Sequence, residues 1–188
     1  MKKIYIFSLL TVFYTFTANS QRKQFSGEQY GHVLNVGFGN GYFSYVGHSI
    51  PVLHANYEFQ VARNFTLAPF ITFYSYSNYQ YWGNAQNPYK NYYYRQSVIP
   101  IGLKGSFYLD DLFSAGDNWD FYMAGSLGVA LRTTTWDDGY MGNRSISHGT
   151  SGVYLDGHLG VEYHINQKIG ALIDLSTGIS TFCLAIHL

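Results

Sequence analysis

Hydrophobic and polar residues alternate with a period of two along most of the chain. Segment 97–109 is the clearest example, because Ile99 and Ile101 share one face of an extended strand while Lys104 and Ser106 share the other. Successive side chains of a β-strand point to opposite sides, so this pattern predicts strands with one apolar and one polar face. The chain is therefore expected to be all-β.

Turn-forming residues divide the pattern into eight predicted strands. Short breaks at 62–64 and 166–167 alternate with long ones, which is typical of an up-and-down antiparallel β-barrel with its short turns at one end. Pro69 and Pro100 fall inside two strands, and their missing N–H groups predict either bulges or different strand limits. The predicted strands are 30–40, 50–61, 65–77, 92–109, 119–134, 151–165, 168–178 and 180–188.

The outward-facing residue nearest the short-turn end is aromatic in six of the predicted strands. Membrane barrels place such a girdle at the lipid–water boundary, whereas a soluble sandwich has no reason for one. We therefore expect a transmembrane barrel. The alternative is a soluble lipocalin-like barrel that turns its apolar face inward around a ligand. The predicted girdle is Tyr30, Phe59, Phe65, Phe107, Phe121 and Tyr163.

Composition supports a surface that does not face water everywhere. Of the 188 residues, 47% are hydrophobic and 19% aromatic, while 12% are charged, against about 25% in an ordinary soluble domain. The formal net charge is zero and no basic stripe is present, which argues against a nucleic-acid partner. Cys183 is the single cysteine, so the chain can form no internal disulfide.

The N-terminus has the features of a cleavable signal peptide. Two lysines precede an uncharged, largely apolar run at 4–16, and the small residues Ala18 and Ser20 stand at −3 and −1 of a cleavage site. The apolar run is shorter than the ~20 residues of a spanning helix. The expected organisation is a signal peptide, 1–20, followed by one barrel domain, 21–188.

Most of the charge within the strands falls on the inward face. An eight-stranded barrel is just wide enough for side chains to fill it, so enclosed charges must find partners. Acids outnumber bases there, which predicts a protonated acid, a cationic histidine or enclosed water. We expect an interior polar plug, with a proton or ion path as the alternative. The predicted network is Glu58, Lys104, Arg132, Asp156, His158, Glu162, His164 and Asp174.

Two segments resemble a known family. Residues 97–105, SVIPIGLKG, resemble a strand of the small outer-membrane β-barrel domain of Bacteroides-like bacteria, and residues 157–178 resemble its closing hairpin, with Asp174 at an acidic position. The resemblance implies an eight-stranded barrel of the OmpA/OmpX type in the bacterial outer membrane, with both termini in the periplasm and no shared catalytic residues. Its implied partners are outer-membrane lipid, lipopolysaccharide and the barrel-assembly machinery. The chain departs from the family by ending in Leu188 instead of an aromatic residue.

Histidines and acids on the inward face are candidate metal ligands. His158, Glu162 and His164 share one face of one strand, with His54 and His187 as candidate neighbours. Glu162 and His164 lie ~7 Å apart along a strand and nothing in the sequence supplies a third ligand. We therefore expect hydrogen-bonded histidines and assign no metal site and no cofactor.

A lipid A-modifying hydrolase is the enzymatic alternative. It needs a nucleophile, a base and an acid together at the outer-leaflet rim. Candidates near the long-loop end follow no triad spacing, so no catalytic residue is assigned. These candidates are Ser75, Ser77, Ser145, Ser147 and His148.

The segment 74–94 is unusually rich in tyrosine. Tyrosine offers a rigid apolar ring and one hydroxyl, which suits binding surfaces, and the neighbouring Asn and Gln suit sugar recognition. The alternative is an outer-leaflet girdle that continues into protruding strands. We expect a non-catalytic outer-membrane barrel with a structural or surface-binding role, whose ligand is an extracellular glycan or protein; a small-solute channel is a further alternative. The binding candidates are Tyr79, Tyr81, Trp82, Tyr89 and Trp136.

Overall fold

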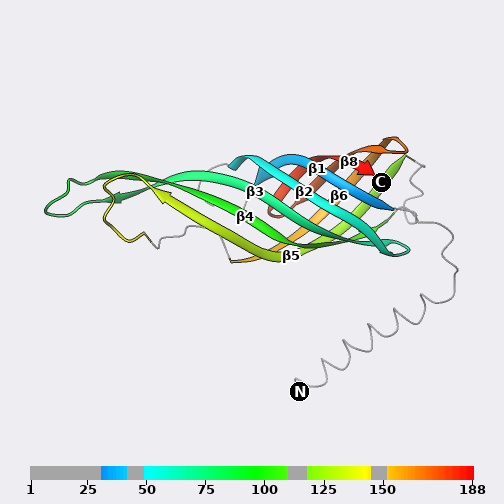
Figure 1. The fold of residues 1–188 in the computed structure, drawn as a ribbon, viewed down its shortest axis with the longest axis horizontal. Coiled ribbons are helices and arrows are strands. Elements are labelled where there is room, and N and C mark those ends of the chain that lie inside the picture. The colour runs from blue at the N-terminus through cyan, green and yellow to red at the C-terminus, as the bar shows by residue number, and fades with distance from the viewer. Residues whose placement is uncertain (1–30, 42–48, 110–117, 145–151) are drawn as a thin grey trace, which may run out of the picture.

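The computed structural model describes residues 31–41, 49–109, 118–144 and 152–188. The predicted signal peptide, Tyr30, and the hydrolase candidates Ser145, Ser147 and His148 lie outside these residues. Eight strands form a closed antiparallel barrel in sequence order, with β1 paired to both β2 and β8 (Figure 1), so the predicted fold class is confirmed. The strands are β1 (His32–Gly41), β2 (Ser49–Ala62), β3 (Phe65–Trp82), β4 (Lys90–Tyr108), β5 (Trp119–Trp136), β6 (Val153–Asn166), β7 (Ile169–Ser176) and β8 (Ile179–His187).

The period of two separates an apolar outside from a polar inside. Leu103, Leu127 and Leu155 form one cross-strand row on β4, β5 and β6, and their exposed fractions are 54%, 62% and 70%. The adjacent row, Lys104, Ser126 and Asp156, points inward and is buried. No described segment forms a helix long and apolar enough to cross a membrane.

Pro69 and Pro100 interrupt the pairing of their strands without changing the register. The pairs between β2 and β3 stop at Asn56–Phe70 and resume in the same register at Phe59–Leu67, on either side of Pro69. Pro100 leaves a similar gap between β3 and β4. Each proline lacks an N–H group, and the neighbouring pairs preserve the alignment. Neither proline produces a bulge or ends its strand.

Three strands continue farther than their predicted ends. β3 reaches Trp82, β4 starts at Lys90 and β5 reaches Trp136, so most of the predicted long loop at 78–91 is a strand hairpin. This hairpin projects beyond the rest of the barrel (Figure 1). Its tip is closed by Asn84, whose side-chain oxygen accepts hydrogen bonds from the backbone N–H groups of Gln86 and Asn87.

The opposite end carries the β2–β3 and β6–β7 turns, the C-terminus and the predicted aromatic residues, whereas the short β7–β8 turn lies at the hairpin end. Phe65 pairs directly with Phe107, and Trp119 pairs with Tyr163 at a ring-centroid distance of 4.7 Å. Trp119 was not among the predicted aromatics and extends their row by one residue. The described members of the predicted girdle all lie on the outward face near this end: Phe59, Phe65, Phe107, Phe121 and Tyr163.

Candidate functional site

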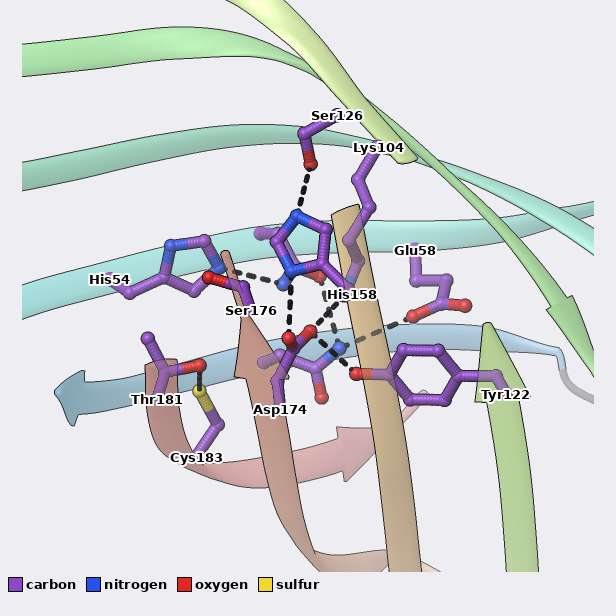
Figure 2. A network of polar contacts seen from close by, with 12 residues as sticks. His54, Glu58, Lys104, Tyr122, Ser126, His158, Asp174, Ser176, Thr181 and Cys183 are labelled. Atoms are coloured by element: carbon purple, nitrogen blue, oxygen red, sulfur yellow. Dashed lines mark hydrogen bonds and ion pairs between the residues drawn. The ribbon is translucent and has the colours of Figure 1, made fainter. Parts of the chain in front are cut away.

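An ion pair crosses the middle of the barrel interior. The Lys104 ammonium on β4 lies 3.2 Å from an Asp174 carboxylate oxygen on β7, and both side chains are almost completely buried. The Tyr122 hydroxyl donates to the same oxygen at 2.7 Å, and His158 Nδ1 lies 2.7 Å from the other oxygen. Figure 2 shows these groups converging on Asp174. Asp174 is therefore the centre of the network.

A glycine opens the path between Tyr122 and Asp174. Gly160 on β6 lies between them in the sheet, paired with Tyr122 on one side and with Asp174 on the other. A Cβ atom on Gly160 would stand 2.0 Å from the Tyr122 ring. The ring can thus lie across β6 because no side chain occupies that position.

His158 links Asp174 to a serine. Its Nε2 lies 2.8 Å from the Ser126 hydroxyl, so serine, imidazole and carboxylate follow one another in the order of a nucleophile, base and acid (Figure 2). Ser126 is only 3% exposed, and the adjoining cavity measures about 10 Å³, roughly the space one water needs. This arrangement has no room for an acyl substrate, and in the structure it joins three strands.

Asp156 holds the turn between β7 and β8. Its oxygens accept hydrogen bonds from Ser176 at 2.8 Å, from Thr177 at 2.6 Å and from the Ile179 backbone N–H at 3.3 Å. The Tyr154 hydroxyl adds a fourth at 3.0 Å. This very short turn lies at the hairpin end of the barrel, and the buried Asp156 carboxylate stabilises it together with Ser176 Oγ, which accepts from the Ile179 N–H at 2.6 Å.

Glu58 is surrounded by neutral donors. The hydroxyl groups of Tyr108, at 2.7 Å, and of Thr66 donate to Oε1, and the Asn35 amide reaches Oε2 at 3.4 Å. Asn35 also donates to the Asn56 side chain at 3.0 Å. Four tightly buried carboxylates thus share the interior with Lys104, the one buried Lys or Arg of the described residues. The carboxylates of Glu58 and Asp156 are stabilised mainly by hydroxyl and amide donors instead of by a further Lys or Arg side chain.

Arg132 is exposed, whereas the sequence predicted it inside the enclosed network. It lies on the inward side of β5, beyond Val129–Val153, which is the last pair between β5 and β6 among the described residues, and its side chain is exposed. Alternation predicted the correct face of β5. It could not predict where the neighbouring strand ends.

A second polar group lies at the turn-bearing end of the barrel. His187 Nε2 on β8 is 2.7 Å from a Glu162 oxygen on β6, and His164 Nε2 is 2.8 Å from an Asp120 oxygen on β5. Glu162 and His164 were predicted members of the interior network. His187 was predicted as a candidate neighbour of these two residues, although not as a member of the network. Asp120 was not predicted, because nothing in its local sequence shows that β5 brings it to His164.

The outward face of β3, β4 and β5 changes from apolar to polar toward the projecting hairpin. Beyond Phe73, Ile99 and Leu131, the next two outward positions on each strand are polar and lie in register with one another. These positions form two adjacent cross-strand rows. We call them together the polar band: Ser75, Ser97 and Thr133 in one row, and Ser77, Arg95 and Thr135 in the next.

Four exposed tyrosines lie on the hairpin beyond the polar band. Tyr79 and Tyr93 are cross-strand neighbours with ring centroids 6.0 Å apart, and Tyr81 and Tyr89 lie 5.8 Å apart. Each is more than half exposed. We call these four residues the tyrosine face. Tyr93 was not among the predicted binding residues. It shares the outward parity of Arg95 and Ser97 on β4, which was the signal for it, whereas Tyr92 and Tyr94 are buried.

The other face of the hairpin is covered by its own chain. Tyr140 is 1% exposed and stacks on Trp136 with centroids 4.1 Å apart and an interplanar angle of 7°. Its ring also packs against Trp82 and Tyr92. Trp82 and Trp136, both predicted as binding residues, therefore support the hairpin from behind instead of lying on the tyrosine face.

Comparisons with known proteins identify the fold. No family model and no curated protein matches the chain. The crystal structure of Neisserial surface protein A is similar over 84% of this chain and 96% of that one, with 13% identity and a TM-score of 0.52. Ail of Yersinia pestis, solved with the heparin analogue sucrose octasulfate, matches over 82% of this chain and 94% of its own, with 6% identity and a TM-score of 0.43. At such identity the likeness to Neisserial surface protein A establishes a shared fold, the small eight-stranded antiparallel β-barrel.

Proposed function

We propose that the chain is a bacterial outer-membrane barrel that displays the tyrosine face outside the cell. The apolar outward surface is as tall as the band by which outer-membrane barrels contact the hydrocarbon core of the membrane. Ten residue steps along β3 separate Phe65 from Ser75, and at ~3.3 Å per residue and ~40° tilt they span about 25 Å, the height of the apolar band in such barrels. Lipid and lipopolysaccharide would contact this band, with the turn-bearing end and both termini in the periplasm.

The polar band is the observation that carries the binding role. It separates the tyrosine face from the apolar surface, so by the same arithmetic Tyr79 and Tyr81 stand about 10 to 15 Å above the lipid boundary. A lipid-anchoring girdle would instead be continuous with the apolar surface. Exposed rings at this height favour a surface that meets a ligand from solution.

The chemistry of the face favours a glycan. Tyr79/Tyr93 and Tyr81/Tyr89 offer two rows of rings for stacking, and Asn91, which pairs with Tyr81 and is exposed, supplies an amide for hydrogen bonding to hydroxyl groups. The exposed Asp137 carboxylate, which accepts a hydrogen bond from the Tyr93 backbone N–H at 3.0 Å, adds an acceptor beside the face. The rigid support from Tyr140 behind the hairpin keeps the ordering cost of binding low.

A glycan microarray tests this function. The purified barrel is compared with a Tyr81→Ala/Tyr93→Ala variant and with a control, Tyr57→Ala/Tyr163→Ala, which removes two exposed tyrosines at the opposite end. Aromatic anchors each contribute about 2 kcal/mol, so the face variant should bind roughly 100-fold or more weakly while the control binds normally. Heat-modifiable gel migration verifies folding of each variant. Glycan binding that survives the face variant would refute the role, and absence of glycan binding would favour a protein ligand.

The filled interior leads to a prediction about transport. The space beside His158 is about 10 Å³, and buried side chains from facing strands meet across the axis at Lys104 and Asp174. We therefore expect no stepwise conductance from the purified protein in planar lipid bilayers. Reproducible unitary conductance would contradict a plugged interior and would favour the channel alternative.

A further inference from the structure

Two histidines and two carboxylates meet at the turn-bearing end of the barrel. They come from three strands: Asp120 from β5, Glu162 and His164 from β6, and His187 from β8. One ligand atom from each of Glu162, His164 and His187 lies within 4.8 Å of the others. We infer that these three residues form a binding site for a divalent transition-metal ion of the Zn²⁺ class, with Asp120 orienting His164.

The distances fit an ion after small side-chain movements. His187 Nε2 is 2.7 Å and His164 Nδ1 is 3.8 Å from Glu162 Oε1. Ligands of a tetrahedral zinc ion, bound at about 2.0 to 2.2 Å, stand roughly 3.3 to 3.5 Å apart. The first separation must widen and the second narrow by less than about 1 Å. The separation between the two histidine nitrogens, which is within 4.8 Å, needs to change by no more than about 1.5 Å.

His164 is oriented as a metal-binding histidine. Its Nε2 lies 2.8 Å from the Asp120 carboxylate, whereas its Nδ1 is directed toward Glu162. A hydrogen bond from Nε2–H to Asp120 fixes the tautomer in which Nδ1 carries the lone pair. Metal-binding histidines commonly have this carboxylate partner on their second nitrogen.

A glycine allows the ligands to reach one another. Gly170 on β7 lies between the strands that carry the ligands, and it is paired with His164 on β6 and with Ala185 on β8. A Cβ atom there would stand 2.0 Å from Glu162 Oε1. The Glu162 carboxylate therefore crosses β7 through a space that only glycine leaves open.

Exposure and donor chemistry indicate the class of ion. Glu162 is buried, whereas the His164 and His187 side chains are 22% and 20% exposed, so an ion can enter from the barrel end and keep water as a fourth ligand. Two imidazole nitrogens with one carboxylate favour Zn²⁺ and its neighbours in the first transition row over Ca²⁺ or Mg²⁺.

Isothermal titration of Zn²⁺ into folded, tag-free protein, previously stripped with a chelator, tests the site. We expect one Zn²⁺ per chain and no comparable binding of Mg²⁺. His187→Ala should abolish saturable binding, and Asp120→Asn should weaken it by about 10- to 100-fold. The control is His32→Ala, which removes an exposed histidine at the same end of the barrel, beside the outward-facing Tyr57, and should leave binding unchanged.

Gly170→Ala tests whether the Glu162 carboxylate is a ligand, because it retains all three ligand residues but displaces this carboxylate from His164 and His187. It should weaken Zn²⁺ binding in protein that still migrates as a folded, heat-modifiable band. As a second measurement, Zn²⁺ should raise the urea midpoint of the unmodified protein but not that of His187→Ala. Absence of saturable binding to the unmodified protein, or binding unaffected by both His187→Ala and Gly170→Ala, would overturn the inference.

Discussion

Replacement of Lys104 by methionine is the most direct test of how the interior holds the barrel together. The substitution keeps most of the side-chain volume but removes the ammonium 3.2 Å from the Asp174 carboxylate. At that distance and an effective dielectric constant of about 20, the lost attraction is about 5 kcal/mol. Tyr122 and His158 still contact Asp174, so we expect the free energy of unfolding to fall by between about 3 and 5 kcal/mol, as for other broken buried pairs.

Urea unfolding in lipid vesicles, followed by tryptophan fluorescence and by heat-modifiable migration, measures this change. The double variant Lys104→Met/Asp174→Asn removes both charges and should recover most of the loss, because no uncompensated carboxylate remains buried. Lys168→Met, at an exposed turn position, should change the free energy by less than about 0.5 kcal/mol. A loss below about 1 kcal/mol for Lys104→Met, or a double variant no more stable than the single one, would refute the reasoning.

Three further substitutions address other parts of the molecule. Gly160→Ala places a Cβ atom 2.0 Å from the Tyr122 ring and should lower the free energy of unfolding by about 1 to 3 kcal/mol in the same urea assay. The control is Gly157→Ala, whose Cβ atom meets no atom within 4 Å. Equal effects of the two variants would contradict the idea that Tyr122 needs the space left by Gly160. Tyr140→Ala removes the ring packed behind the hairpin and should destabilise the hairpin locally by about 3 to 5 kcal/mol, so a protease should cut the hairpin faster. An unchanged cleavage rate would show that the hairpin does not depend on this ring. Asp156→Ala removes the acceptor of the Ser176 and Thr177 hydroxyl groups and the longer of two hydrogen bonds from the Ile179 N–H. It should speed amide hydrogen exchange at the β7–β8 turn but not in the hairpin, and uniform protection would count against it.

The strand pattern was readable from the sequence because alternation is a local property. Any strand that contains this segment must place the odd-numbered Ile101 and Leu103 on one side and the even-numbered Lys104 and Ser106 on the other. The number of strands, their antiparallel order and the polar interior followed from this alternation and from the turn residues. The extra length of the hairpin did not, because it depends on pairing and on the packing of Tyr140 against its inner face.

The meeting of side chains across the barrel was decided only by the tertiary structure. Lys104 and Asp174 are 70 positions apart, and Glu162 and His187 come from strands separated by β7. The inward parity of most of these residues is visible in the sequence, but their level along the axis depends on the register of every intervening strand pair. Gly160 and Gly170 read locally as weak strand residues, and only the closed barrel shows that they are the openings through which Tyr122 and Glu162 reach their partners. The sequence by itself determined which residues face inward, and barrel closure determined which of them meet, because alternation is set within one strand whereas contact is set by all eight.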